Sequence, residues 1–85
     1  MLQITDSAAR TLKSALEKVS EVDEPRFRVG IVEGSVKMAI DQERAGDTTI
    51  QHQGEALIVM DTATSDRLHG RKIDFDHETS GLVLK

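Results

Sequence analysis

The stretch 28-RVGIVEGSVKMAI-40 alternates apolar and small or charged residues on either side of Gly34 and Ser35. Alternation with a period of two is typical of strands that bury one face. A two-residue loop whose first residue is glycine suits a type II′ turn, in which glycine supplies the positive φ. The stretch therefore predicts a hairpin of two antiparallel strands, with Gly34 and Ser35 as its loop.

The register of this hairpin can be tested by asking which side chains face each other. With Gly34 and Ser35 as the loop, apolar residues meet apolar ones and opposite charges meet: Ile31 faces Met38, Val29 faces Ile40, Gly30 faces Ala39 and Arg28 faces Asp41. A three-residue loop sets Ile31 against Lys37 and mixes the two faces. The sequence alone leaves open whether Gly34-Ser35 is only a turn or the remnant of a longer functional loop.

Outside the hairpin, the pattern predicts two helices and several further strands. Apolar residues recur at helical spacing from Asp6 to Val19, after a cap at Thr5 or Asp6. The other expected elements are strands at 2–5, 48–53, 56–60, 72–77 and 81–85 and a short helix within 61–70, capped by Asp61 or Thr62 and followed by Gly70. The segment 48–53 reads as an edge strand, and the apolar run 56–60 as a strand buried on both faces.

The expected fold class is α+β: mainly antiparallel sheet, or a pseudo-barrel, of about seven short strands, with one long N-terminal helix and one short helix. Residues 1–85 leave room for one domain. Cysteine is absent from these residues, so neither disulfides nor thiolate ligands stabilise the chain. Homo-oligomerisation is the remaining way for a small scaffold to gain stability.

Composition excludes several functions. The net charge of −4 and an aromatic content of 2% argue against a nucleic-acid partner, which needs basic and stacking side chains. The first ten residues contain Asp6 and no long apolar run, so neither a signal peptide nor a membrane span is expected there, and a cytoplasmic location follows by default.

Five segments of the sequence, taken in chain order, resemble segments of the HesB-like family of A-type iron–sulfur cluster carriers. They are LQITDSAARTLKSAL (2–16), FRVGI (27–31), GDTTIQHQGEALIVMD (46–61), SDRLHGRKIDF (65–75) and SGLVLK (80–85). Together they span nearly the whole chain, and the resemblance implies the HesB-like fold for residues 1–85.

The resemblance also implies three cysteines, which family members use to hold iron or a cluster between subunits and deliver it to acceptor proteins. One lies in a glycine-rich loop after the strand that contains Phe27, and two lie in a tail beyond the last strand. Around Gly34-Ser35 this chain is several residues shorter than the family pattern, and the given sequence stops at Lys85, before that tail. No family ligand can be assigned to a residue here, so we expect no cluster and no other cofactor.

Histidine and carboxylate residues are the remaining candidates for metal binding. His52, Asp76 and His77 are weak candidates, because no two histidines have ligand spacing and a site needs three or four converging ligands. In a regular strand, Asp76 also points to the face opposite His77. The favoured interpretation is a solvated acidic strand with no metal.

A local basic cluster within 67–72 is the candidate for partner binding. It contains Arg67, His69, Arg71 and Lys72 in an otherwise acidic chain. Such a cluster is either a solvated loop or a contact for an acidic partner protein. No serine lies in a Gly-x-Ser-x-Gly elbow and no glycine pattern fits a phosphate loop, so we expect no enzyme.

Two hypotheses follow. The first is a cysteine-less, non-enzymatic HesB-like domain that acts as an accessory or regulatory protein-interaction module related to iron–sulfur cluster biogenesis. The alternative is a labile iron- or metal-binding protein that uses histidine and carboxylate ligands, across a dimer if necessary.

Overall fold

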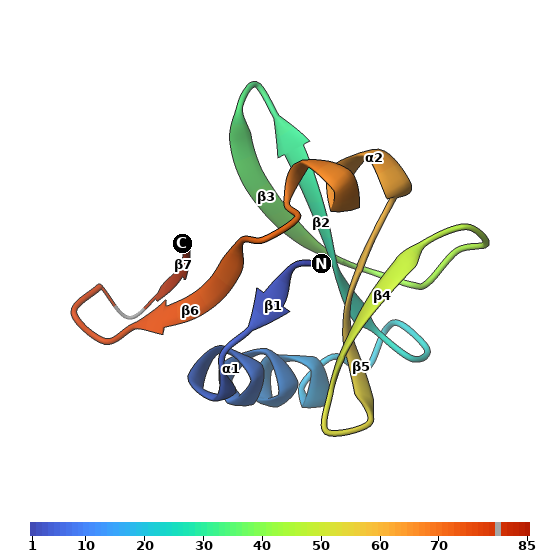
Figure 1. Cartoon of the computed structure of the whole chain (residues 1–85). Coiled ribbons are helices and arrows are strands. Elements are labelled where there is room, and N and C mark those ends of the chain that lie inside the picture. The colour runs from blue at the N-terminus through green and yellow to red at the C-terminus, as the bar shows by residue number, and fades with distance from the viewer. Residues whose placement is uncertain (80) are drawn as a thin grey trace.

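The computed structural model describes residues 1–79 and 81–85, and its nine elements follow each other as shown in Figure 1. In chain order they are β1 (Gln3–Ile4), α1 (Asp6–Glu17), β2 (Arg26–Val32), β3 (Ser35–Asp41), β4 (Thr48–His52), β5 (Glu55–Met60), α2 (Thr62–Arg67), β6 (Lys72–Asp76) and β7 (Gly81–Leu84). The α+β class, the two helices and the seven strands are confirmed.

The strands form two mixed sheets rather than one barrel. The larger sheet has the order β3-β2-β5-β4, and the smaller has the order β1-β6-β7. Each of the three hairpins is antiparallel, but β2 pairs with β5, and β1 with β6, in parallel. The pseudo-barrel is therefore wrong: among the described residues no strand of one sheet pairs with a strand of the other, so both sheets stay open at their edges.

The β2–β3 hairpin forms as predicted, but its turn lies one residue earlier. Val32 pairs with Ser35, so the loop residues are Glu33 and Gly34, with φ of 51° and 77°. Positive φ at both positions is the signature of a type I′ turn, which matches the twist of the flanking strands better than the other common turns. The predicted Gly34-Ser35 loop and its type II′ geometry are therefore wrong.

The register moves by two residues, so every side chain keeps its face. Val29 faces Met38 and Ile31 faces Val36. The observed register also gains an apolar rung, because Phe27 faces Ile40 rather than a glutamine. Facing alone could reject a shift of one residue but not a shift of two.

Helix α1 starts where its cap predicts. The Thr5 hydroxyl accepts a hydrogen bond from the backbone N–H of Ala8 at 3.2 Å. The helix ends at Glu17, earlier than the predicted Val19, and its twelve residues are close to the average helix length. The expectation of a long helix is corrected to one of ordinary length that is still longer than α2.

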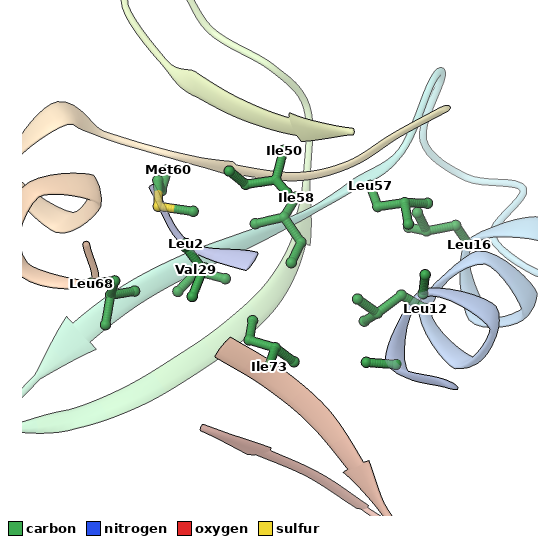
Figure 2. Packing of buried hydrophobic residues seen from close by; sticks show 12 residues of the cluster. Leu2, Leu12, Leu16, Val29, Ile50, Leu57, Ile58, Met60, Leu68 and Ile73 are labelled. Atoms are coloured by element: carbon green, nitrogen blue, oxygen red, sulfur yellow. The ribbon is translucent and has the colours of Figure 1, made fainter. Parts of the chain in front are cut away.

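The core lies between the inner face of α1 and the two sheets (Figure 2). Helix α1 contributes Leu12 and Leu16, and β5 contributes four consecutive buried residues, Leu57 to Met60. The prediction that β5 is buried on both faces is thus confirmed. β4 is an edge strand as predicted, and Asp61 caps α2 by accepting from the N–H of Thr64 at 2.8 Å.

Candidate functional site

The tip of the β2–β3 hairpin occupies the position where the family resemblance implies a loop with a ligand. Glu33 and Gly34 are exposed, and a Cβ added at Gly34 would meet no atom within 4 Å. The positive φ of Gly34 explains the glycine there, since other residues adopt this backbone conformation less readily. The tip is a tight two-residue turn with no loop long enough to enclose a ligand.

At the other end of the same hairpin, Arg28 binds two carboxylates. Its Nε lies 2.6 Å from Asp41 Oδ2, and its two terminal nitrogens lie 3.1 and 2.5 Å from the two carboxylate oxygens of Asp47. The fork geometry of guanidinium suits this bidentate contact with Asp47. The backbone carbonyl of Gln42 accepts a further bond at 3.1 Å.

These contacts shift the titration of all three side chains. The hydrogen bonds that Arg28 donates to Asp47 and then to Asp41 raise the pKa of Arg28, and the bond from Arg28 lowers the pKa of Asp47. The pKa of Asp41 is lowered first by the backbone N–H of Gln42 and then by Arg28. Arg44 also pairs with Asp41 at 2.9 Å, so two guanidinium groups face two carboxylates. The arrangement therefore ties the 42–47 loop to the sheet rather than offering a free ligand group.

The weak metal candidates do not come together. His52 on β4 has its Nε2 2.7 Å from Asp6 Oδ1 at the start of α1. Asp76 ends β6 and accepts from the N–H of Glu78 at 2.9 Å, and the ring of His77 packs edge-on to Phe75 with centroids 5.0 Å apart. Among residues 1–79 and 81–85, no three His, Asp or Glu side chains are grouped to hold a metal ion.

The strand that was expected to carry His77 is shorter than predicted. β6 ends at Asp76, and His77 lies in the turn toward β7. The alternation rule used for its orientation therefore stops one residue before it, although its edge contact with Phe75 still sets it on the side of the odd-numbered residues.

The basic cluster occupies the end of α2 and the start of β6. All four of its side chains belong to exposed residues: Arg67, His69, Arg71 and Lys72. Two of them already have partners, because His69 Nδ1 lies 2.6 Å from the amino group of Met1 and Arg71 Nε donates to the carbonyl of Lys85 at 3.0 Å. Arg67 and Lys72 have no side-chain ion pair within the described residues.

A groove of about 340 Å³ lies between α1 and the β4–β5 hairpin. Two side-chain contacts join its polar walls: His52 Nε2 lies 2.7 Å from Asp6 Oδ1, and Lys13 Nζ forms an ion pair with Glu55 Oε1 at 2.8 Å. Arg10 and Lys13 in the lining are balanced by Asp6 and Glu55, so the groove presents no concentrated charge to a ligand. No local sequence pattern predicts this groove, because two of its lining residues, Asp6 and His52, are 46 positions apart in the chain.

Asp74 on β6 is the acid most strongly affected by its surroundings. Its pKa falls to about 2, because it accepts hydrogen bonds from the Thr5 hydroxyl at 2.7 Å, from Lys85 Nζ at 3.0 Å and from the N–H of Phe75 at 2.8 Å. Through Thr5 it also orients the cap of α1. Asp74 thus joins the start of the helix to the smaller sheet.

We expect the replacement of Asp74 by asparagine to make the free energy of unfolding less dependent on pH at acidic pH. The lowered pKa in the folded state means that the contribution of Asp74 is complete above the unfolded pKa, near 3.9, and is lost as the pH falls toward about 2. Urea unfolding at pH 2.5 to 6 measures this, with Asp66→Asn on the exposed side of α2 as the matched control. Equal pH profiles for Asp74→Asn and the wild type contradict the assignment.

No known family profile and no curated protein matches the sequence. Solved structures do match. The crystal structure of Escherichia coli SufA, described as involved in biosynthesis of iron–sulfur clusters, superposes with a TM-score of 0.72 at 19% identity, covering 99% of this chain and 81% of SufA. The chain has the SufA fold.

Two further solved structures also match the fold of this chain. IscA, crystallised with the [2Fe-2S] cluster, gives a TM-score of 0.64 at 19% identity over 100% of this chain and 82% of IscA. A protein from Aquifex aeolicus solved by NMR gives 0.67 at 21% identity over 99% of this chain and 89% of its own. The resemblance to A-type carriers that the sequence predicts is confirmed for the fold, whereas the given sequence contains no cysteine.

Proposed function

We propose that this chain is a non-enzymatic accessory domain of iron–sulfur cluster biogenesis that binds protein partners and holds no cluster. The observation that supports the proposal is the combination of a SufA-like fold over the full chain with a β2–β3 hairpin closed by Glu33 and Gly34. The family resemblance implies a cysteine-bearing loop after β2, and the chain has a tight turn there. A SufA-like shape without that ligand suits recognition rather than cluster transfer.

The basic cluster is the part of the surface that we propose for an acidic partner. Arg67, Arg71 and Lys72 are exposed and lie within one connection between α2 and β6. Charge complementarity of this kind mainly steers association and sets specificity. The cytoplasmic location expected from the sequence stays part of this proposal. In addition, no helix in the described ranges is both long and apolar enough to cross a bilayer.

Anaerobic reconstitution with ferrous iron and sulfide, with SufA treated in parallel, tests the first half of the proposal. We expect SufA, whose biological role is cluster biosynthesis, to acquire visible absorption and this chain to acquire none. Stoichiometric, protein-bound absorption in this chain would contradict the proposal. Titration with ferrous iron and zinc in the same samples tests the alternative: micromolar binding that His77→Ala weakens would favour a metal-binding protein.

Affinity capture from the native host tests the second half. We expect proteins of iron–sulfur cluster assembly to be enriched on the wild-type domain, and the double variant Arg71→Glu, Lys72→Glu to lose them. Lys18→Glu, a charge reversal of an exposed residue at the end of α1, is the matched control. Equal enrichment on all three proteins would remove the basic cluster from the interface.

A further inference from the structure

The strand edges of the two sheets differ in how well they are protected against further pairing. β1 has two residues, the register of β4 with β5 shifts between Ile50 and Gln51, and β3 carries Lys37 and Asp41. Short strands, irregularities and charged side chains are the usual protection of a sheet edge. β7 (Gly81–Leu84) has no charged residue, and its pairs with β6 keep one register. The edge of β7 is therefore the one most open to an added strand.

β7 offers backbone groups along its outer side. Lys72 and Lys85 exchange two hydrogen bonds, of 3.0 and 2.7 Å, so they form a hydrogen-bonded pair of the ladder between β6 and β7. Such pairs alternate with pairs whose N–H and C=O groups point away from the neighbouring strand. Counting from Lys85, these are the groups of Leu84 and Leu82. No turn, loop or cap hydrogen bond in residues 1–79 and 81–85 uses them, so they are available to another strand.

The side chains along this edge are apolar and only half-covered. Leu82 and Leu84 pack against the margin of the core, and both stay half-buried. On the other face, Val83 lines a groove of about 440 Å³ together with Asp76 and Lys85. Figure 1 shows β7 on the side of β6 opposite β1, at the margin of the molecule. In strand addition, backbone bonds give affinity and pockets for alternate side chains give specificity, and the edge of β7 provides both.

Charges of opposite sign lie at the two ends of β7. Arg71 Nε donates to the carbonyl of Lys85 at 3.0 Å, so this guanidinium lies at the carboxyl end of the strand. At the amino end, Gly81 pairs with Asp76, and Glu78 is exposed in the turn that follows β6. Arg71, Asp76 and Glu78 form no ion pair in the described ranges. A strand added here is matched best by an acidic residue at one end and a basic residue at the other.

We infer that β7 accepts an extended segment of an acidic partner protein, antiparallel to β7 and with its acidic end beside Arg71. The inference rests on the proposed function, in which Arg71 belongs to the partner-binding surface, and it names the form in which that partner binds. Apolar residues of the segment face Leu84 and Leu82, and a basic residue lies opposite Gly81. The antiparallel direction is chosen because it is the more stable of the two pairings.

A second copy of the chain fits this edge less well. Of the antiparallel registers within residues 81–85, the one with the longest overlap pairs Val83 with its counterpart and Gly81 with Lys85. Because glycine has no side chain, neither Lys85 nor the nearby Arg71 would meet a carboxylate on the added strand. A segment of another protein can supply an acidic residue at that position, which is the reason to choose it as the occupant.

A synthetic peptide, acetyl-Glu-Val-Thr-Val-Lys-amide, tests the pairing, because its valines face Leu84 and Leu82 and its threonine faces Val83. We expect it to shift the backbone amide signals of Leu82 and Leu84 in an NMR titration of the full chain, with a Kd of about 0.1 to 1 mM. N-methylation of the first valine removes the N–H that bonds Leu84 and should weaken binding at least about tenfold. N-methylation of the threonine is the matched control, because that N–H points away from β7.

Three outcomes of this titration would overturn the inference. One is equal binding of the two methylated peptides, and another is the absence of any shift at about 5 mM peptide. The third is a shift of the Leu82 and Leu84 signals that grows with protein concentration in the absence of peptide, because a second copy would then occupy the edge.

Arg71→Glu tests the polarity of the segment. We expect it to weaken binding of the glutamate peptide about fivefold and to leave a peptide with glutamine in place of glutamate unaffected. An equal effect on both peptides would overturn the inference. Cluster uptake on reconstitution would contradict the proposed function but leave these peptide results unchanged. Failure of the peptides, with capture through the basic cluster intact, would contradict the strand addition alone.

Discussion

Replacement of Ile58 by alanine is expected to lower the free energy of unfolding by about 3 to 4 kcal/mol. Ile58 is 0% exposed and lies at the centre of β5, where it is in register with Ile50 of β4 and Phe27 of β2. The truncation leaves a cavity between β2, β4 and β5, which cannot all shift to fill it. The loss of free energy therefore includes a cavity term in addition to the transfer free energy of the missing methyl groups.

That loss is large for this chain. Domains are typically stable by about 0.05 to 0.15 kcal/mol per residue, or about 4 to 13 kcal/mol for a chain of this length. Urea unfolding followed by circular dichroism measures it, and Val32→Ala is the matched control, because Val32 is 55% exposed at the end of β2. We expect about 0.5 kcal/mol or less for Val32→Ala. Equal losses at both sites would mean that β5 is not the centre of the core.

Replacement of Arg28 by methionine is the second large effect, at about 2 to 3 kcal/mol. The side chain of Asp47 is only 6% exposed and takes both of its guanidinium contacts from Arg28. Without Arg28 this carboxylate keeps a single hydrogen bond, from the N–H of Arg44 at 2.7 Å. A nearly buried charge that loses its partner costs more than the net contribution of the intact pair.

A double-mutant cycle with Asp47→Asn isolates the pair, and we expect a coupling free energy of about 1 to 2 kcal/mol. Since Arg28 lowers the pKa of Asp47, the contribution of the pair is complete above the unfolded pKa and is lost as the solution is acidified; Arg28→Met should therefore flatten the profile below about pH 4. Arg44→Met is the control, because Arg44 is 69% exposed and contacts only Asp41 by an ion pair. Additive losses in the cycle would rule out the coupling.

Much of the fold could be predicted because its signals are local. The cap at Thr5 and the cap at Asp61 follow from side chains that satisfy nearby N–H groups. The apolar run of β5 and the polar pattern of β4 gave their central and edge positions. The hairpin turn was misplaced because two registers that differ by two residues keep the same faces. Parallel pairing of β2 with β5 has no local signal at all.

The contacts in the candidate sites could likewise be predicted only where strand pairing gives a signal for them. The contact between Arg28 and Asp41 was foreseen from strand pairing, although in the observed register Arg28 sits opposite Ala39 and reaches Asp41 diagonally. Asp47 was missed as a partner because it comes from the loop after β3, and no periodicity places a loop residue. The partner-binding role of the basic cluster stays a prediction, as does the assignment of residues 1–85 to a single domain.

The hydrogen bond from Thr5 to Asp74 has a consequence for the order in which the chain folds in the cell. A ribosome that adds about 5 to 20 residues per second needs about 3 to 14 s to synthesise the 69 positions from one residue to the other. During that interval the first helix has its own cap but neither the carboxylate that orients it nor the strand, β6, that carries it. Helix α1 can contact β2 and β5 earlier, but its attachment to β6 forms only after one of the last strands has been translated.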